Sequence, residues 1–384
     1  MTSSLISSRD ASKDFSNVDE ERRREEPSPF EVVLVAEQEG VIQATGGLRV
    51  IPDYSLDAIH STVLGPAVGG ARFWNYASED EALADALRLS RGMTYKNALP
   101  RLPLGGGKSV IIGDSKLANR EAIFRAHGRF VETLGGRYIT AEDVGTSPSD
   151  MEIVCRETNH VAGLLGRSGD PAPITARGVF RAIEASAKYL WNSDRLAGVT
   201  VAIQGCGHVG YHLAKNLYAA GARLIASDVD AEKVSRLIEE FNAVAVQPDD
   251  IFAVSADIFA PCALGGVIND RTIPQLLARI VVGAANNQLL EERHGEMLKE
   301  EGILYAPDYA ANAGGIFNGC IELLGSEPER ASKKVDEIYE TVLEIFETAK
   351  AEVTSTNKAA DRIAENRFLA AAGLQNVAEM KLAT

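Results

Sequence analysis

The segment VTVAIQGCGHVG, residues 199–210, begins as an apolar run and ends in three closely spaced glycines. The run is typical of a buried parallel strand, and the glycines are spaced as in a turn that leads from such a strand into a helix. A second apolar run, RLIAS at 223–227, follows the expected helix and ends beside Asp228. This order of strand, glycine turn, helix and strand predicts a dinucleotide-binding unit, whereas a lone glycine pattern would be weak evidence.

Each of the three glycines is needed in this turn for a different physical reason. Gly205 permits the tight turn, Gly207 lets the backbone approach a pyrophosphate, and Gly210 allows the helix to pack closely on the strand. The amino terminus of the helix would stabilise the phosphate charge. Asp228 would accept hydrogen bonds from the adenosine ribose and repel a 2′-phosphate, which favours NAD over NADP. Arg223 is the opposing detail, but it begins its strand and is expected to point elsewhere.

Further apolar runs at 257–262, 279–284 and 302–306 are expected to add strands to the same sheet. Asn286 and Asn287 follow one of these runs, and PDYAANAGG at 307–315 follows another. Open α/β sheets bind ligands at the carboxyl ends of their strands, so these neutral amides suit a nicotinamide amide or a substrate carboxylate. Ordinary loop-capping asparagines explain the same residues equally well.

A second glycine-rich stretch contains two lysines and an aspartate. It reads LGPAVGGAR at 64–72, GMTYKN at 92–97, LGGGKS at 104–109 and YITAEDVG at 138–145. The glycines before Lys108 would let backbone and substrate approach closely. In such apolar surroundings desolvation would lower the pKa of Lys96 or Lys108 toward the range of a general base. The alternative is solvated surface lysines, with Asp143 as a helix cap.

Strands and helices alternate along the chain. Short strands are expected at 31–36, 47–51, 109–113 and 137–140, and helices at 78–89, 120–134 and 176–191. The first of these helices carries a capping pattern, Ser78 followed by Glu81. The stretch GRSGDPAP at 166–173 indicates a hinge. Apolar spacing between 327 and 382 predicts long helices that pack back on the first domain.

These elements predict an α/β protein with two domains. We expect a substrate-binding, catalytic and oligomerisation domain at 30–172 plus 336–384, and a doubly wound Rossmann domain at 173–335. The charged, serine-rich residues 1–29 are expected to form a disordered extension.

Composition narrows the class of partner. The net charge of −15 argues against nucleic acid or an anionic membrane as the main partner, so a small molecule is expected. The four cysteines lie far apart without a CxxC pair, which predicts neither a disulfide framework nor a zinc or other metal site. Reduced cysteines and the lack of an apolar signal core predict a cytoplasmic protein. A membrane span is not expected, because no apolar run reaches about 18 residues.

The two stretches together resemble the Glu/Leu/Phe/Val dehydrogenases, a family of NAD(P)-dependent amino-acid dehydrogenases. The resemblance covers about residues 30–369 and rests on GPAVGGAR, RLSRGMTYKNA, LGGGKSVIIGD, YITAEDVGT, PAPITARGV, IQGCGHVG, APCALGG, GAANNQL and YAPDYAANAGG. The first half is most similar to the leucine enzymes. The family implies NAD as cofactor, an amino acid, a 2-oxo acid and ammonia as small-molecule ligands, and a homo-oligomer.

The resemblance also implies a role for each polar residue of the second stretch. Lys96 would bind the substrate carboxylate, so that the Cα hydrogen faces nicotinamide C4 for hydride transfer. Lys108 would activate the water that attacks the resulting iminium, and Asp143 would assist proton transfer. The products would be a 2-oxo acid and ammonia. Asn287 would contact the substrate, and closure of the cleft between domains would exclude bulk water.

The remaining implied contacts define the cofactor and the side-chain pocket. The cofactor residues would be Thr175, Gly205, Gly207, His208, Val209, Gly210, Asp228, Ala263 and Asn286. The pocket residues would be Val68, Gly69, Ala141, Ile316 and Gly319. Glutamate enzymes of the family carry a lysine where this chain has Val68, so glutamate would bury an unpaired carboxylate at a cost of several kcal/mol. Gly319 replaces a valine usual in the leucine enzymes and opens room for an aromatic ring.

Several substrates and functions stay open. Oxidation of leucine or another branched-chain amino acid is the leading hypothesis, and phenylalanine or tryptophan is the alternative, which the link at 167–173 favours because it is similar to that of the tryptophan enzymes. A hypothesis of a different class is an inactive NAD-binding sensor or scaffold. Retention of Lys96, Lys108, Asp143 and Asn287 together argues against it. An enzyme acting on simple amines would have no need of Lys96.

Overall fold

The computed structural model describes residues 55–117, 120–164, 170–324 and 333–373, together with two short strands at 42–44 and 48–50. These strands, β1 (Ile42–Ala44) and β2 (Leu48–Val50), pair antiparallel. β2 lies within the strand expected at 47–51. The strand expected at 31–36 and the extension expected at 1–29 fall outside the described residues.

The first unit is built on a four-stranded sheet in the order β3-β5-β4-β6. Its strands are β3 (Ser55–Ser61), β4 (Ala67–Trp74), β5 (Gly105–Ile112) and β6 (Tyr138–Glu142). β4 runs parallel to both of its neighbours, and the edge strand β3 runs antiparallel to β5. Neither β3 nor β4 is among the expected strands, because a buried aspartate in β3 and two glycines in β4 interrupt the apolar pattern that identifies a strand.

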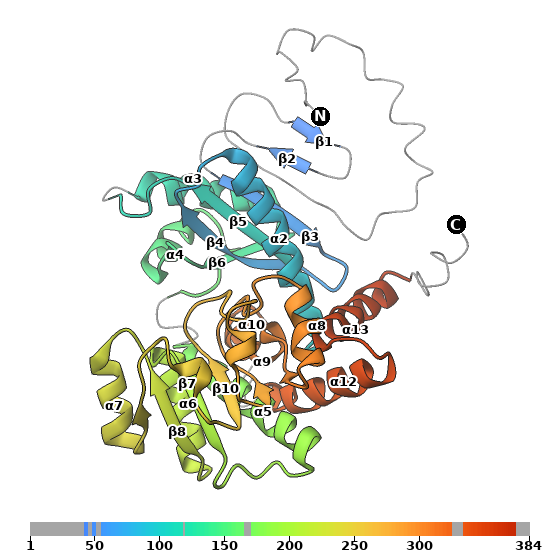
Figure 1. Ribbon diagram of the computed structural model, residues 1–384. Coiled ribbons are helices and arrows are strands. Elements are labelled where there is room, and N and C mark those ends of the chain that lie inside the picture. Colours follow the sequence, from blue (N-terminus) through green and yellow to red (C-terminus); the bar gives the residue numbers. More distant parts are fainter. Residues whose placement is uncertain are drawn as a thin grey trace, which may run out of the picture.

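Helices cover both faces of this sheet (Figure 1). α2 (Glu79–Ala98) packs its alanines on one face against Leu56 and Val110. α3 (Glu121–Thr133) and α4 (Pro148–Val154) cover the other face around Phe73. α2 begins with the predicted cap but continues to Ala98 instead of ending at residue 89, because no proline interrupts it. Lys96 therefore lies in the last turn of a helix.

The second unit is a six-stranded parallel sheet in the order β12-β11-β10-β7-β8-β9. Its strands are β7 (Thr200–Gln204), β8 (Arg223–Ser227), β9 (Val244–Ala245), β10 (Ile258–Pro261), β11 (Ile280–Val281) and β12 (Leu304–Tyr305). The chain starts in the middle, fills one side, and then crosses to β10 and fills the other. This order confirms the predicted doubly wound fold, with its switch point between β7 and β10.

The helices of the second unit are α5 (Ala172–Trp191), α6 (His208–Ala219), α7 (Ala231–Phe241) and α8 (Arg293–Glu300), with short turns at Ile251–Ala253 and Ile273–Gln275. α5 begins before the expected residue 176, because a proline is tolerated in the first turn of a helix. Part of the expected hinge, residues 165–169, falls outside the described residues.

The C-terminal part contains α9 (Asp308–Ala311), α10 (Gly314–Leu324), α12 (Ile338–Ala351) and α13 (Thr356–Ala371). α13 returns to the first unit, where Phe368 contacts Tyr95 of α2 with ring centroids 5.7 Å apart (Figure 1). α12 instead packs on α5, with Phe346 and Tyr189 centroids 5.0 Å apart. Within the described residues, no helix is both long enough and apolar enough to cross a membrane.

Candidate active site

The glycine run of β5 determines how closely α2 approaches the sheet. A Cβ on Gly106 would lie 2.0 Å from the backbone nitrogen of Thr94 in α2, and a Cβ on Gly107 would lie 2.7 Å from the ring of Tyr138. The expectation that these glycines admit substrate is thus corrected: they are buried within a strand, and they admit a helix and a tyrosine ring. Because alternate residues of a strand share a face, Lys108 lies on the α2 side, as Gly106 does.

Lys108 and Asp143 meet at the carboxyl end of the first sheet. Asp143 follows β6, as the sequence predicts, whereas Lys108 projects from the middle of β5, a strand that was expected to begin only at residue 109. The Nζ atom of Lys108 lies 2.8 Å from Oδ2 of Asp143, and the lysine side chain is only 6% exposed. Two residues far apart in the sequence thus form a nearly dry ion pair.

The charges of this pair depend on their surroundings. Burial lowers the pKa of the Lys108 ammonium and Arg72 lowers it further, whereas Asp143 acts in the opposite direction. Burial by itself would raise the pKa of the Asp143 carboxyl, but Lys108 and Arg72 together hold it below its ordinary value. Asp143 is therefore ionised at neutral pH, and Lys108 loses its proton more readily than a solvated lysine.

Lys96 connects the two units. Its Nζ atom lies 3.5 Å from Oδ1 of Asn286, which follows β11 in the second unit. Burial lowers the pKa of Lys96 to about 8, with a smaller contribution from Lys108, while Asp308 acts in the opposite direction. An ammonium near this pKa is still mostly protonated at neutral pH and can hold a carboxylate.

The loop at 286–288 is held by residues that the sequence reasoning missed. The Nδ2 atom of Asn312 donates to Oδ1 of Asn286 at 2.7 Å. Asp308, which is buried, accepts from the backbone nitrogen of Gln288 at 3.0 Å. Asn287 has a φ of 52°, a left-handed conformation that asparagine tolerates better than most residues. Both supporting residues lie in the segment 307–315, which the sequence indicated as a ligand-binding end of a strand. The segment alone did not indicate which atoms these residues contact.

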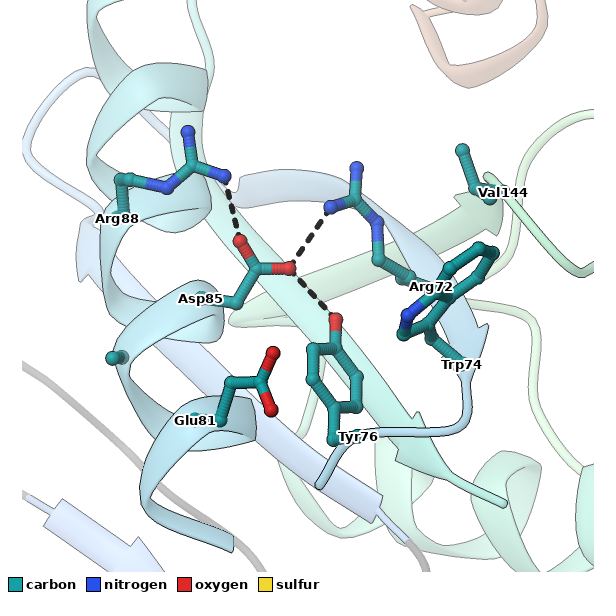
Figure 2. Close-up of a pocket in the computed structure, with 8 residues that line it drawn as sticks. Arg72, Trp74, Tyr76, Glu81, Asp85, Arg88 and Val144 are labelled. Atoms are coloured by element: carbon teal, nitrogen blue, oxygen red, sulfur yellow. Dashed lines mark hydrogen bonds and ion pairs between the residues drawn. The ribbon is translucent and has the colours of Figure 1, made fainter. Parts of the chain in front are cut away.

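Arg72 is a third residue of the site that sequence reasoning missed. Its Nε atom lies 3.0 Å from Oδ2 of Asp143, and its Nη1 atom lies 2.9 Å from Oδ2 of Asp85 in α2. Figure 2 shows Asp85 also receiving bonds from Tyr76 and Arg88. The only sequence signal was the position of Arg72 at the end of GPAVGGAR, and its two partners lie on other elements.

The glycine turn of the second unit has the expected shape. Gly205 has a φ of 97°, and a Cβ there would lie 2.7 Å from the nitrogen of Ala263 after β10. A Cβ on Gly210 would lie 2.0 Å from the carbonyl oxygen of Gly205, so that helix and turn touch. A Cβ on Gly207 would meet nothing within 4 Å. The first turn of α6, which starts at His208 and Val209, has no side-chain cap.

These features fit a dinucleotide. The open surface at Gly207 and the uncapped helix terminus can receive a pyrophosphate. Asp228 at the end of β8 accepts from the backbone nitrogen of Cys206 at 2.7 Å and from that of Asp230 at 2.9 Å. Each carboxylate oxygen has a second lone pair that a ribose hydroxyl could use. Arg223 lies at the opposite end of β8.

The expected pocket residues come from both units. Val68 and Ala141 lie on the neighbouring strands β4 and β6, and Ile316 packs at the edge of the core cluster that contains Val68. Gly69 is required for pairing, because a Cβ there would lie 1.7 Å from the carbonyl oxygen of Gly107. A Cβ on Gly319 of α10 would meet no atom of the described side chains within 4 Å.

Thr175 lies in the first turn of α5, beside the start of α10. Its hydroxyl donates to the carbonyl oxygen of Pro171 at 2.8 Å and would lie 3.0 Å from a Cβ on Gly315. The helix that begins the second unit is thereby in contact with the helix that carries Ile316 and Gly319.

One group of possible metal ligands occurs among the described residues, and it is not part of this site. Asp270, Glu291 and His294 bring their ligand atoms within 4.8 Å of one another. Arg293 already pairs with Asp270 at 2.5 Å and with Glu291 at 2.9 Å. The arrangement is an ion-pair cluster in which a guanidinium takes the place of a metal ion.

Comparisons with known proteins agree with this geometry. Residues 33–160 match the model of the Glu/Leu/Phe/Val dehydrogenase dimerisation domain, and residues 166–232 and 227–384 match that of Glutamate/Leucine/Phenylalanine/Valine dehydrogenase. Leucine dehydrogenase from Geobacillus stearothermophilus is 56% identical over 314 residues, which are 81% of this chain and 86% of that protein. Phenylalanine dehydrogenase from Caldalkalibacillus thermarum (strain TA2.A1) is 46% identical, with the same coverage of both chains.

A solved structure gives the same result for the fold. The crystal structure of L-tryptophan dehydrogenase from Nostoc punctiforme is 46% identical and matches with a TM-score of 0.78, covering 87% of this chain and 96% of that one. The family models that span both units, the relatives above 40% identity, the ion pair of Lys108 with Asp143 and the contact of Lys96 with Asn286 all agree. The chain therefore belongs to the Glu/Leu/Phe/Val dehydrogenase family and is an amino-acid dehydrogenase, an oxidoreductase.

Proposed function

We propose that the protein catalyses the reversible, NAD-dependent oxidative deamination of an apolar L-amino acid, of the leucine or branched-chain type, to a 2-oxo acid and ammonia. The observation that carries the proposal is that Lys96 of the first unit contacts Asn286 of the second, while the paired Lys108 and Asp143 lie near enough to act on the pKa of Lys96. The relatives described above differ in the substrate they are named for, so the side-chain preference is argued from this chain's own residues.

Lys96 binds the substrate carboxylate in this proposal. Its ammonium is mostly protonated at neutral pH and lies at the junction of the two units, within reach of Asn286. A carboxylate held there fixes the position of the amino acid's Cα, which removes much of the entropic cost of the reaction. Asn287, on the same loop, provides a second polar contact.

Lys108 and Asp143 handle protons. A fraction of Lys108 is neutral because burial lowers the pKa of its ammonium. Neutral Lys108 accepts a proton from the water that attacks the oxidised Cα, and it returns a proton to the departing amine. Asp143, 2.8 Å away, stabilises the ammonium after each protonation and exchanges protons with the substrate nitrogen.

The glycine turn of the second unit binds the cofactor. A nicotinamide dinucleotide bound there would supply the hydride acceptor. Gly207 and the amino terminus of α6 receive its pyrophosphate, and Asp228 receives the ribose hydroxyls. NAD is proposed rather than NADP, because the carboxylate of Asp228 would repel a 2′-phosphate and the nearest cation on that strand, Arg223, lies at the other end.

An apolar side chain is favoured by Val68. This residue is 8% exposed in a hydrophobic cluster, so a glutamate carboxylate beside it would be buried without a partner. An uncompensated buried charge costs about 3–5 kcal/mol, equivalent to a preference of roughly 10²- to 10⁴-fold for leucine. Glutamate is therefore excluded from the proposal.

An aromatic substrate is the second candidate, and one observation favours it. The family resemblance places Gly319 in the side-chain pocket, and among the described residues a Cβ there would meet no atom within 4 Å. A phenyl or indole ring could occupy that space and gain about 25 cal/mol for each Å² of apolar surface buried.

One panel tests the proposal. Initial rates of NADH formation would be measured with leucine, valine, phenylalanine, tryptophan and glutamate, each also with NADP in place of NAD. We expect the highest kcat/KM with leucine or valine, and none of note with glutamate. A higher kcat/KM for phenylalanine or tryptophan would select the aromatic candidate. Dinucleotide binding without turnover of any amino acid would contradict the proposal and support an inactive sensor.

We also propose a homo-oligomer in the cytoplasm. Support for the oligomer is the match of residues 33–160 to a domain described as a dimerisation domain. Support for the compartment is that Cys155, Cys206 and Cys262, the cysteines among the described side chains, are all free. Light scattering of the purified protein tests the first point.

A further inference from the structure

A single oxygen atom of Asp143 receives two cations. Lys108 Nζ lies 2.8 Å from Oδ2 of Asp143, and Arg72 Nε lies 3.0 Å from the same atom. Charge-assisted bonds of this length are among the stronger hydrogen bonds in proteins. They fix the carboxylate plane from two sides and leave the other oxygen, Oδ1, for further partners.

Arg72 is itself held in place from its far side. Its Nη1 donates to Oδ2 of Asp85 at 2.9 Å, and the Tyr76 hydroxyl donates to the same oxygen at 2.7 Å. Arg88 reaches the other oxygen of Asp85 at 2.7 Å, as Figure 2 shows. The guanidinium therefore spans two carboxylates, one that is expected to react and one that is anchored on α2.

Arg72 is also the boundary between the ion pair and a separate cavity. A cavity of about 490 Å³ is lined by Arg72, Trp74, Tyr76, Glu81, Ala84, Asp85, Arg88 and Val144. Figure 2 shows Trp74 and Val144 beside the guanidinium. The Arg72 side chain is 21% exposed, whereas that of Lys108 is 6% exposed. The Arg72 side chain therefore separates this cavity from the buried ion pair of Lys108 and Asp143.

We propose that Arg72 is a positioning residue for the deamination reaction, which orients the Asp143 carboxylate and keeps Lys108 able to give up its proton. The inference rests on the proposed function, in which Lys108 acts as the base. Arg72 touches neither a substrate atom nor a cofactor atom in this account. It acts through Asp143 and through its own fixed positive charge.

Several charged or titratable groups face the Lys108–Asp143 pair, and the pKa values of the pair depend on the combined effect of their charges. Arg72 comes from β4, Lys108 from β5, and Glu142 from the end of β6, where burial and, to a smaller extent, Asp143 raise the pKa of the Glu142 carboxyl. Asp85 and Lys96 come from α2, and the Tyr138 hydroxyl lies on β6. Arg72 is the only one of these that bonds to Asp143 besides Lys108.

Removing the Arg72 charge has a definite sign. Arg72 lowers the pKa of both Lys108 and Asp143, whereas Asp85 raises that of Lys108. Without the guanidinium, both pKa values rise, so Lys108 stays protonated to higher pH. The acid limb of the deamination profile then moves to higher pH, by about one unit for a charge within 4–6 Å.

The experiment compares Arg72→Gln, Arg72→Lys and the parent enzyme. The dependence of kcat/KM on pH would be measured for deamination of the best substrate of the panel. We expect the acid limb of Arg72→Gln to move up by about one pH unit. Arg72→Lys keeps the charge but can bond only one carboxylate at a time, so its limb should stay near that of the parent while kcat falls about 10-fold.

Matched controls separate a local effect from general damage. Arg125→Gln removes an arginine that pairs with Glu157 on the α3 and α4 side of the sheet, and its profile should equal that of the parent. Asp85→Asn keeps the Arg72 charge but removes an anion that raises the pKa of Lys108. The acid limb of the pH profile of this variant must therefore not move to higher pH. A uniform loss of kcat at every pH in Arg72→Gln, without a shifted limb, would indicate a merely structural role and overturn the inference.

A second readout does not need dehydrogenase activity. The rate at which an amine reagent modifies Lys108 can be followed by peptide mass spectrometry over a pH series. The pH of half-maximal reactivity should rise in Arg72→Gln, and an unchanged value would contradict the inference. If the parent enzyme deaminates no amino acid, the proposed function fails, yet this titration still decides whether Arg72 sets the proton affinity of Lys108.

Discussion

The substitution Gly106→Ala tests how the two lysines are brought together. The new Cβ would lie 2.0 Å from the backbone nitrogen of Thr94 and 2.4 Å from its hydroxyl oxygen. Real Cβ atoms essentially never come closer than 3.0 Å to such an atom, so strand or helix must move by about 1 Å. No rotamer change can relieve the clash, because the nearest atom belongs to the backbone of α2.

The displacement affects both stability and chemistry. Overpacking of this kind costs about 1–3 kcal/mol of folding free energy. Thr94 lies two positions before Lys96, and Asn97 Nδ2 donates to the Gly105 carbonyl at 2.5 Å, so the last turn of α2 moves with it. A misplacement of about 1 Å can lower turnover about 10²-fold. We therefore expect a loss of kcat/KM larger than the loss of stability explains.

The assay needs a matched control on the same helix. A Cβ on Gly92 would meet nothing within 4 Å, so Gly92→Ala should stabilise α2 by about 1 kcal/mol and leave kcat/KM unchanged. Denaturant unfolding and initial rates at saturating cofactor would be compared for both variants and the parent. If Gly106→Ala kept the parent's midpoint and kcat/KM, the argument that glycine sets the distance between α2 and β5 would be refuted.

Three further predictions concern the site itself. Lys108→Ala should lower kcat for deamination by about 10²- to 10⁴-fold while the dissociation constant for NAD, measured by fluorescence titration, stays the same; normal turnover would remove Lys108 as the base. Because Lys96 is charged only below its pKa of about 8, the KM for the amino acid should rise as the pH exceeds that value, and Lys96→Ser should have a high KM at every pH; an unchanged KM would refute its carboxylate role. Asp228→Ser should narrow the ratio of kcat/KM for NAD over NADP, and an unaltered ratio would mean that Asp228 does not select the cofactor.

The second unit could be predicted closely from the sequence. Five of its strands and the turn at Gly205 lie where the apolar runs and glycines indicated, whereas the short edge strand β9 was not predicted. The order of its sheet follows from parallel strands joined by helices. Such features are local, or they follow from a common topology. The family resemblance also assigned Lys108 and Asp143 to one active site, but their ion pair was not predicted.

The first unit was harder to predict from sequence. Strands β3 and β4 break the apolar pattern, since β3 buries Asp57 and β4 places two glycines in its centre. The glycines of β5 look like an open loop in sequence, yet they are the surface on which α2 and Tyr138 pack. Secondary-structure propensity depends on a residue and its neighbours in the sequence, whereas these glycines are required by packing contacts with other helices and strands.

The sequence by itself determined the family and the dinucleotide turn, and it singled out Lys96, Lys108 and Asp143 as candidates, because short motifs specify backbone shape and chemistry locally. Only the tertiary structure decided that Arg72 shares Asp143 with Lys108, that Asp308 and Asn312 hold the loop at 286–288, and that α12 packs on α5. These contacts join residues from different elements. Their distances depend on strand order and helix packing, which no local pattern contains.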